Sequence, residues 1–214
     1  MRVKFCGITR LEDAREAARL GAWAIGLIHH DASPRRVDPA VAAEIGAELR
    51  RRLEVVGVFV NPTLDQVTAA AEDEALTMLQ LHGEEGPAFC QEVARRTGCK
   101  VIKAFRVRSS AEIAGAEAFR TDLHLFDAHH PELRGGTGES FEWELLAGRS
   151  SSVPFLLSGG LDPDNVAEAV SAVRPFAVDV ASGVEAEPGS KDHAAMAAFF
   201  ARAQPAAVAG GGDS

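Results

Sequence analysis

Two residues whose side chains can transfer protons stand at the ends of apolar segments. Cys6 ends residues 2–6 and is followed by Gly7, and Asp127 follows residues 123–126. A thiolate can accept a proton and a protonated carboxyl group can donate one, so the pair suits acid–base chemistry. Each residue also has a simpler interpretation, because a lone cysteine often packs as a small apolar side chain and an aspartate often caps a loop. Which interpretation holds depends on whether the fold brings them together.

Glycines follow two further apolar segments near the end of the chain. Residues 153–157 lead into Ser158-Gly159-Gly160, and residues 175–180, which include Asp179, lead into Ala181-Ser182-Gly183. Glycine lets a tight turn aim backbone N–H groups at one anion. In (β/α)8 barrels the loops after the seventh and eighth strands frequently bind phosphate. We therefore predict a phosphate site formed by Gly159, Gly160, Ser182 and Gly183.

Polar side chains at other segment ends complete the candidate site. Arg35 follows Ser33-Pro34, and a guanidinium group on that stiffened loop suits a carboxylate, although an ordinary charged surface is the alternative. His82 follows residues 77–81 and is a candidate to line the same site. The pairs His29-His30 and His129-His130 suggest a metal, but no carboxylate or cysteine stands at a ligand spacing. We expect no metal.

Eight apolar segments alternate with eight helical segments at the spacing of βα units. The predicted strands are residues 2–6, 23–28, 55–60, 77–81, 101–105, 123–126, 153–157 and 175–180. The predicted helices are residues 11–20, 38–52, 61–71, 87–96, 110–118, 141–146, one that begins at 162, and 192–203. We expect Thr9 and Glu12 to form a capping box, and Asp38 and Asp162, each before a proline, to cap helices.

This alternation predicts an α/β protein with a single (β/α)8 TIM barrel over residues 1–203 and a disordered tail over 204–214. The strands are rich in Val, Ile, Leu and Phe, as strands buried on both faces are. An open nucleotide-binding sheet would carry Gly-x-Gly-x-x-Gly after its first strand, and Cys6-Gly7-Ile8-Thr9 does not match. In the barrel, Asp127 and Cys6 belong to the strands on either side of the phosphate loops.

Composition limits the partners. The chain has 214 residues and a net charge of −9, which argues against nucleic acid. It has no apolar run of the roughly 18 residues that a membrane span needs, and its first residues turn polar too soon for a signal peptide. Three cysteines without a framework spacing indicate a reduced, cytoplasmic protein. We expect a small phosphorylated molecule as partner, and a monomer or homodimer.

The motifs around these residues resemble those of the phosphoribosylanthranilate isomerase family of tryptophan and aromatic amino acid biosynthesis. The resemblance covers about residues 2–203. The matching stretches are Lys4-Phe5-Cys6-Gly7-Ile8-Thr9, Ser33-Pro34-Arg35, Gly57-Val58-Phe59-Val60-Asn61, Leu79-Gln80-Leu81-His82-Gly83, Gly135-Gly136-Thr137-Gly138, Leu157-Ser158-Gly159-Gly160-Leu161 and Ser182-Gly183-Val184-Glu185.

The resemblance implies a cofactor-independent Amadori rearrangement and a role for each candidate. Asp127 is then the general acid that opens the furanose ring, and Cys6 is the general base at C2. Such an acid needs a raised pKa or a proton delivered with substrate, and such a base needs surroundings that lower its pKa. Arg35 matches the arginine that meets the anthranilate carboxylate, Asp179 matches a residue lining the same pocket, and the glycine loops match the phosphate cradle. For His82 the motif match favours a place in the lining of the site and implies nothing more.

Two alternatives remain open at the level of sequence. A histidine-pathway aminoaldose isomerase also binds phosphate on a barrel, but it uses an aspartate pair, and Cys6 argues against it. A barrel that only binds a phosphorylated ligand would show affinity without turnover, and losing the Cys6 thiol would not affect it.

Overall fold

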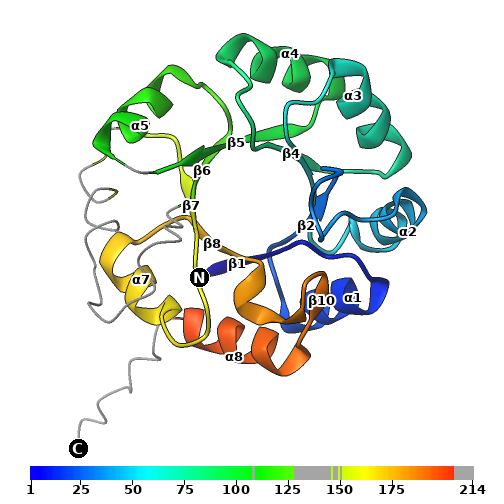
Figure 1. Cartoon of the computed structure of the whole chain (residues 1–214), viewed down its shortest axis with the longest axis vertical. Helices are drawn as coiled ribbons and strands as arrows, with labels where there is room; N and C mark the ends of the chain where they lie inside the picture. Colours follow the sequence, from blue (N-terminus) through cyan, green and yellow to red (C-terminus); the bar gives the residue numbers. More distant parts are fainter. Residues whose placement is uncertain (108, 128–145, 147–148, 150, 205–214) are drawn as a thin grey trace, which may run out of the picture.

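Eight parallel strands close into a barrel, and the helices surround it (Figure 1). The computed structural model describes residues 1–107, 109–127, 146, 149 and 151–204. Strand order follows the sequence, and the ring closes where β8 pairs with β1, with Lys4 opposite Asp179. The barrel strands are β1 (Arg2–Cys6), β2 (Ala24–Ile28), β3 (Glu54–Phe59), β4 (Met78–Leu81), β5 (Lys100–Arg106), β6 (Leu123–Asp127), β7 (Phe155–Ser158) and β8 (Ala177–Val180). The predicted (β/α)8 barrel is confirmed.

The helices follow the strands, as βα units require. They are α1 (Leu11–Leu20), α2 (Pro39–Leu49), α3 (Leu64–Asp73), α4 (Pro87–Thr97), α5 (Ser110–Gly115) continued by the 3₁₀ turn η1 (Ala116–Ala118), α7 (Val166–Val173) and α8 (His193–Ala203). The helix predicted over 141–146 lies outside the described residues apart from Leu146. The tail over 205–214 also lies outside them, while Gln204 accepts a hydrogen bond from the amino group of Met1.

A small hairpin after β8 was not predicted. The 3₁₀ turn η2 (Ser182–Val184) leads into β9 (Glu185–Glu187), which pairs with β10 (Ser190–Lys191). The hairpin lies against the start of α1, because the hydroxyl of Thr9 donates to the carbonyl of Gly189. This short element carries two side chains of the site.

Two predicted helix starts are wrong. Thr9 does not cap α1, because Arg10 occupies the cap position and the Thr9 hydroxyl is used by the hairpin. Asp162 does not begin α7, because its carboxylate accepts from the N–H groups of Asp164 and Asn165 and closes a turn, so that α7 starts at Val166. Asp38 does cap α2, accepting from the N–H groups that follow Pro39.

Side chains alternate between two buried layers along each strand. Val3 and Phe5 of β1 pack outward against the helices, while Cys6 packs inside the barrel. The inner layer is mostly Val, Ile, Leu, Met and Ala. It also holds the polar residues Lys4 and Asp179, which are almost completely buried. Charged groups inside a barrel need a partner, so their positions point to the site.

No helix in the described ranges is long and apolar enough to cross a membrane.

Candidate active site

The predicted site residues gather at the rim where the strands end. A cavity of about 270 Å³ lies there, between β6, β7, β8 and the loop after β2. Six of the nine candidates line it: Arg35, Asp127, Gly159, Gly160, Asp179 and Ser182. A second cavity, of about 640 Å³, adjoins it on the side of His82 and Arg106. Residues as far apart in the chain as Arg35 and Ser182 therefore line one cavity at the edge of the barrel.

Cys6 ends β1 and keeps only 6% of its surface exposed. The thiol lies against the backbone of Gly26 on β2, where a Cβ atom would come within 2.7 Å of Sγ and within 3.1 Å of the Lys4 Nζ. Only glycine leaves room there for both groups. Burial raises the pKa of the Cys6 thiol, although the ammonium of Lys4 acts in the opposite direction. The expectation that the surroundings lower this pKa is therefore wrong for this structure.

Lys4 and Asp179 form an ion pair inside the barrel. The Lys4 Nζ is 2.7 Å from Oδ1 of Asp179, and the Ser158 hydroxyl donates to the other oxygen at 3.1 Å. Burial disfavours the charge on Lys4, but the attraction of Asp179 and Cys6 outweighs it, so the pKa of Lys4 is raised. Lys4 was missed as a site residue. The signal was a lysine in the middle of an apolar strand.

His82 and Asp127 face each other across the rim. The Nε2 atom of His82 is 3.7 Å from Oδ2 of Asp127, an ion-pair distance rather than a hydrogen bond. The amide nitrogen of Gln80 lies 3.2 Å from Nδ1 of His82. In the tautomer whose Nδ1 accepts from this amide, the ring proton is on Nε2, the atom nearest to Asp127. A proton donor next to the carboxyl group can stabilise its ionised form.

The two glycine loops meet backbone to backbone. Gly159 and Gly160 both have positive φ, at 99° and 65°, which side chains other than glycine rarely adopt. A Cβ atom on Gly183 would collide with the carbonyl oxygen of Leu161, so the loop after β8 touches the loop after β7. This close approach brings the two loops together next to the smaller cavity, which Gly159, Gly160 and Ser182 line.

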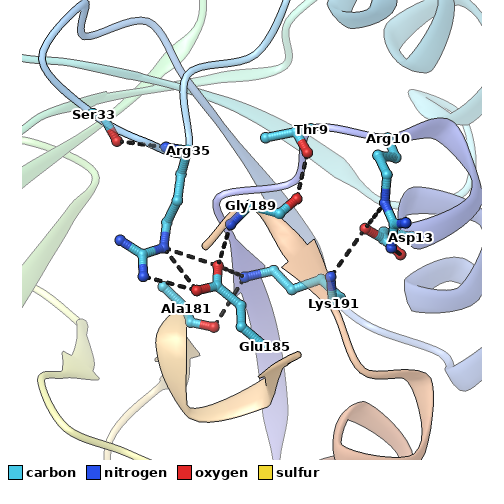
Figure 2. Close-up of polar contacts among 9 residues, drawn as sticks. All are labelled: Thr9, Arg10, Asp13, Ser33, Arg35, Ala181, Glu185, Gly189 and Lys191. Carbon is cyan, nitrogen blue, oxygen red and sulfur yellow. Dashed lines mark hydrogen bonds and ion pairs between the residues drawn. The ribbon is translucent and has the colours of Figure 1, made fainter. Parts of the chain in front are cut away.

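Arg35 is held by the hairpin. Its Nε and Nη2 atoms donate to both carboxylate oxygens of Glu185, at 2.7 to 3.0 Å, and Lys191 contacts the same carboxylate (Figure 2). The guanidinium–carboxylate pair raises the pKa of Arg35. Glu185 and Lys191 were missed as site residues, since strands of three and two residues leave no periodic signal.

The histidine pairs do not form a metal site in the described structure. His29 stacks face to face on Phe59, with ring centroids 4.7 Å apart, and so packs as an aromatic side chain. His129 and His130 lie outside the described residues. Over the ranges that the structure describes, no three His, Cys, Asp or Glu side chains are grouped as metal ligands.

The sequence is similar to a known protein family over nearly its whole length. The sequence model of the family described as N-(5′-phosphoribosyl)anthranilate (PRA) isomerase matches residues 3–202. A relative named N-(5′-phosphoribosyl)anthranilate isomerase, from Geobacter sp. (strain M21), is 47% identical over 203 residues, which is 95% of this chain and 98% of the relative.

Solved structures agree with the sequence comparison. The phosphoribosyl anthranilate isomerase from Thermotoga maritima is 42% identical, with a TM-score of 0.85 over 95% of this chain and 98% of that one. Another structure is of a phosphoribosyl anthranilate isomerase in complex with reduced 1-(o-carboxyphenylamino)-1-deoxyribulose 5-phosphate. It is 39% identical, with a TM-score of 0.83 and the same two coverages of 95% and 98%.

Proposed function

The chain belongs to the N-(5′-phosphoribosyl)anthranilate isomerase family, and we propose that it converts N-(5′-phosphoribosyl)anthranilate to 1-(2-carboxyphenylamino)-1-deoxyribulose 5-phosphate in tryptophan biosynthesis. One observation carries the proposal beyond family membership. Cys6 on β1 and Asp127 on β6 flank the two strands whose glycine loops line the smaller cavity. A sugar phosphate anchored by those loops has a base on one side and an acid on the other.

The reaction begins with Asp127 as general acid. Its carboxyl group donates a proton to the furanose ring oxygen, the bond between that oxygen and C1′ breaks, and the anthranilate nitrogen supplies the electron pair that forms the iminium ion. Asp127 is left as a carboxylate. The imidazole of His82, whose Nε2 atom lies 3.7 Å from this carboxylate, is placed to stabilise the new charge.

Cys6 acts next as general base. The thiolate is the minor form of Cys6 at neutral pH, because burial raises the pKa of the thiol. It takes the proton from C2′ of the iminium ion, giving an enolamine and a neutral thiol. The enolamine then gains a proton at C1′ and loses the proton of its 2′-hydroxyl group, which gives the ketone without an oxidant. Exchange with solvent returns one proton to the Asp127 carboxylate and removes one from the Cys6 thiol, which restores the acid and the base. Lys4 is the cation next to the thiolate, and it opposes the effect of burial on the pKa of Cys6.

Binding groups hold the two ends of the substrate. The N–H groups of the loops containing Gly159, Gly160, Ser182 and Gly183 bind phosphate, as glycine-rich backbone nests do. Arg35 binds the anthranilate carboxylate, and Asp179 keeps Lys4 in place next to Cys6. We expect no cofactor, because every step is a proton transfer. We also expect a cytoplasmic enzyme that acts as a monomer or homodimer and binds neither nucleic acid nor membrane.

Turnover tests this function directly. Freshly made N-(5′-phosphoribosyl)anthranilate is mixed with enzyme in the presence of a chelator, and the fluorescence of the anthranilate group is followed. Wild type should turn over. Cys6→Ser and Asp127→Asn should each lose a factor of about 10² to 10⁴ in kcat, the usual contribution of acid–base groups.

Matched controls separate chemistry from folding. Cys99→Ser changes a thiol just before the start of β5, at the opposite end of the barrel from the strand ends that line the cavity. Asp65→Asn changes an exposed carboxylate, so both variants should keep wild-type rates. Binding of inorganic phosphate without turnover in wild type would instead indicate a ligand-binding barrel. Near-normal kcat in Asp127→Asn would contradict the acid assignment.

A further inference from the structure

The hairpin after β8 forms a three-membered ion cluster with Arg35. Glu185 accepts from Nε and Nη2 of Arg35, and the Nζ atom of Lys191 donates to Oε1 of the same carboxylate at 2.9 Å. Figure 2 shows the Glu185 carboxylate between the two cations. One carboxylate thus orients a guanidinium group that belongs to a different loop.

The cluster keeps a net positive charge. Two cations share one anion, and the side chains of Glu185 and Lys191 are 4% and 0% exposed. Burial opposes the charge on Glu185, but its bonds to Arg35 and Lys191 outweigh this and hold its pKa below the ordinary range. Glu185 is therefore ionised at neutral pH. Burial lowers the pKa of Lys191, although its bond to Glu185 acts in the opposite direction. With Lys191 protonated, the cluster has one positive charge left for a ligand.

Arg35 is also confined from the opposite side. A Cβ atom on Gly7 would come within 2.8 Å of the Arg35 Cδ, so the stem of the side chain lies on the backbone next to Cys6. In Figure 2 the remaining terminal nitrogen, Nη1, points away from Glu185. Arg35 lines the smaller cavity together with the glycine loops. The N–H groups of Nη1 are thus available to an anion in that cavity.

Lys191 connects this cluster to the loop after β8. Its Nζ atom also donates to the carbonyl of Ala181 at 2.9 Å, and Ala181 directly precedes Ser182 of the predicted phosphate site. Its backbone N–H donates to the buried Asp13 of α1 at 3.3 Å, which anchors the hairpin. A single ammonium group therefore holds both the carboxylate that orients Arg35 and the backbone of the phosphate loop.

Given the isomerase activity proposed for this chain, we propose that Glu185 and Lys191 are positioning residues that fix Arg35 for the substrate carboxylate at a set distance from the phosphate loop. Neither residue touches the reacting atoms. Glu185 sets the orientation of the guanidinium group, and Lys191 sets the spacing between the two ends of the binding site. A rigid spacing lowers the entropy that substrate binding must offset.

The test uses two inhibitors that differ by one carboxylate. One is reduced 1-(o-carboxyphenylamino)-1-deoxyribulose 5-phosphate, and the other is the same molecule with a phenyl ring lacking the carboxylate. Wild type should prefer the first. Glu185→Gln should lose about tenfold of this preference, because a neutral amide no longer orients Arg35, while the affinity for the second inhibitor stays within about twofold. The ratio is measured on one sample, so it does not depend on the fraction of protein that is folded.

Lys191→Met distinguishes orientation from spacing. It should weaken both the preference for the carboxylate and the binding of inorganic phosphate, because the ammonium group holds Ala181 as well as Glu185. Glu187→Gln, an exposed change on the same strand β9, is the matched control and should behave as wild type.

In Glu185→Gln, KM for the substrate should rise more than kcat falls.

Three outcomes would overturn the inference. Unchanged preference in Glu185→Gln would show that Arg35 needs no positioning. Tighter binding of the carboxylated inhibitor in that variant would show that Glu185 competes with the substrate for Arg35. Phosphate affinity unchanged in Lys191→Met would remove the link to the phosphate loop. Failure of the proposed function is seen separately, as absence of turnover in wild type, while the ratio of inhibitor affinities still tests the positioning.

Discussion

Lys4 and Asp179 are direct partners across the seam that closes the barrel, and their side chains meet at 2.7 Å inside it. The pair lies one layer below the thiol of Cys6, since Lys4 and Cys6 are two residues apart on one strand and share its inner face. Asp179 thus neutralises a lysine that the interior could not otherwise hold, and the lysine places a cation next to the thiol. The ion pair that closes the barrel also sets the electrostatics of the proposed base.

Removing one partner of this pair should cost much more stability than removing both. Lys4→Met leaves Asp179 as a buried carboxylate without a cation, which we expect to cost about 3 to 5 kcal/mol of unfolding free energy. Lys4→Met/Asp179→Asn removes both charges and should recover most of that loss. Urea denaturation measures both variants.

Activity should not recover with stability. The double variant leaves the Cys6 thiolate without its cation, so kcat should stay at least about tenfold below wild type. A stable double variant with wild-type kcat would show that Lys4 only holds Asp179. A double variant as unstable as Lys4→Met would show that packing, rather than charge, explains the loss.

The Cys6 thiol should be protonated at neutral pH. Burial raises its pKa above the ordinary value of about 8.5, so thiolate should form only in more alkaline solution. The ultraviolet absorbance of the thiolate, titrated in wild type and Cys6→Ser, gives the contribution of Cys6 by difference. Lys4→Met/Asp179→Asn should move this titration, because the ammonium group that favours the thiolate is gone. A Cys6 titration near neutral pH in wild type would contradict the effect of burial.

The barrel could be predicted because its signal is local. Each strand is a short apolar run and each helix begins near a cap or a proline, so the alternation is visible without knowing any contact. The wrong predictions concern features that a local pattern does not show. Thr9 has the right type and spacing for a capping box, but its hydroxyl is taken by Gly189 of a hairpin 180 residues away. The hairpin itself has strands of three and two residues, too short for any period.

The placement of the candidate site residues was predictable wherever it depends on strand ends. Cys6, His82, Asp127 and the glycine loops follow from the rule that parallel strands deliver their carboxyl ends to one rim. The contact between Arg35 and Glu185 joins residues 150 positions apart, and no pattern within either segment encodes it. The raised pKa of Cys6 likewise depends on how completely the barrel covers the thiol, which a sequence does not show.

The contact between the two glycine loops should be essential for binding phosphate. Gly183→Ala would place a methyl group on the carbonyl oxygen of Leu161, and because both sides are backbone, one loop must move. We expect the dissociation constant for inorganic phosphate and the KM for substrate to rise about tenfold or more, corresponding to about 1.4 kcal/mol at each tenfold step. Isothermal titration and steady-state kinetics measure the two quantities.

Gly115→Ala is the matched control for that variant. Gly115 lies at the end of α5 with ordinary helical φ, and a Cβ atom there would meet nothing within 4 Å. Alanine should therefore leave phosphate binding unchanged and raise stability by roughly 0.4 to 1 kcal/mol, because it restricts the unfolded chain. Equal effects of the two alanines on phosphate binding would show that the loop contact is not needed.

Stability should fall as pH drops below about 6.5, with His124 as one cause. Its side chain on β6 is fully buried, and its Nε2 atom donates to the carbonyl of Phe119 at 3.0 Å. Burial lowers the pKa of His124, and the nearby Arg149 adds to this. The pKa of an unfolded histidine is about 6.5, and that of His124 in the folded protein is lower. At a pH between these two values, His124 binds more protons in the unfolded chain than in the folded one, so lowering the pH favours unfolding there.

His124→Phe keeps an aromatic ring among Phe105 and Phe126 but cannot titrate. It should lose some stability at neutral pH, because the carbonyl of Phe119 loses its donor, while its unfolding free energy should depend less steeply on pH below about 6.5 than that of wild type. Urea denaturation in steps from about pH 8 to pH 5 measures both slopes. Above about pH 7.5, where an unfolded histidine is also neutral, the two curves should run parallel. Parallel curves over the whole range would show that His124 takes up its proton equally well in both states.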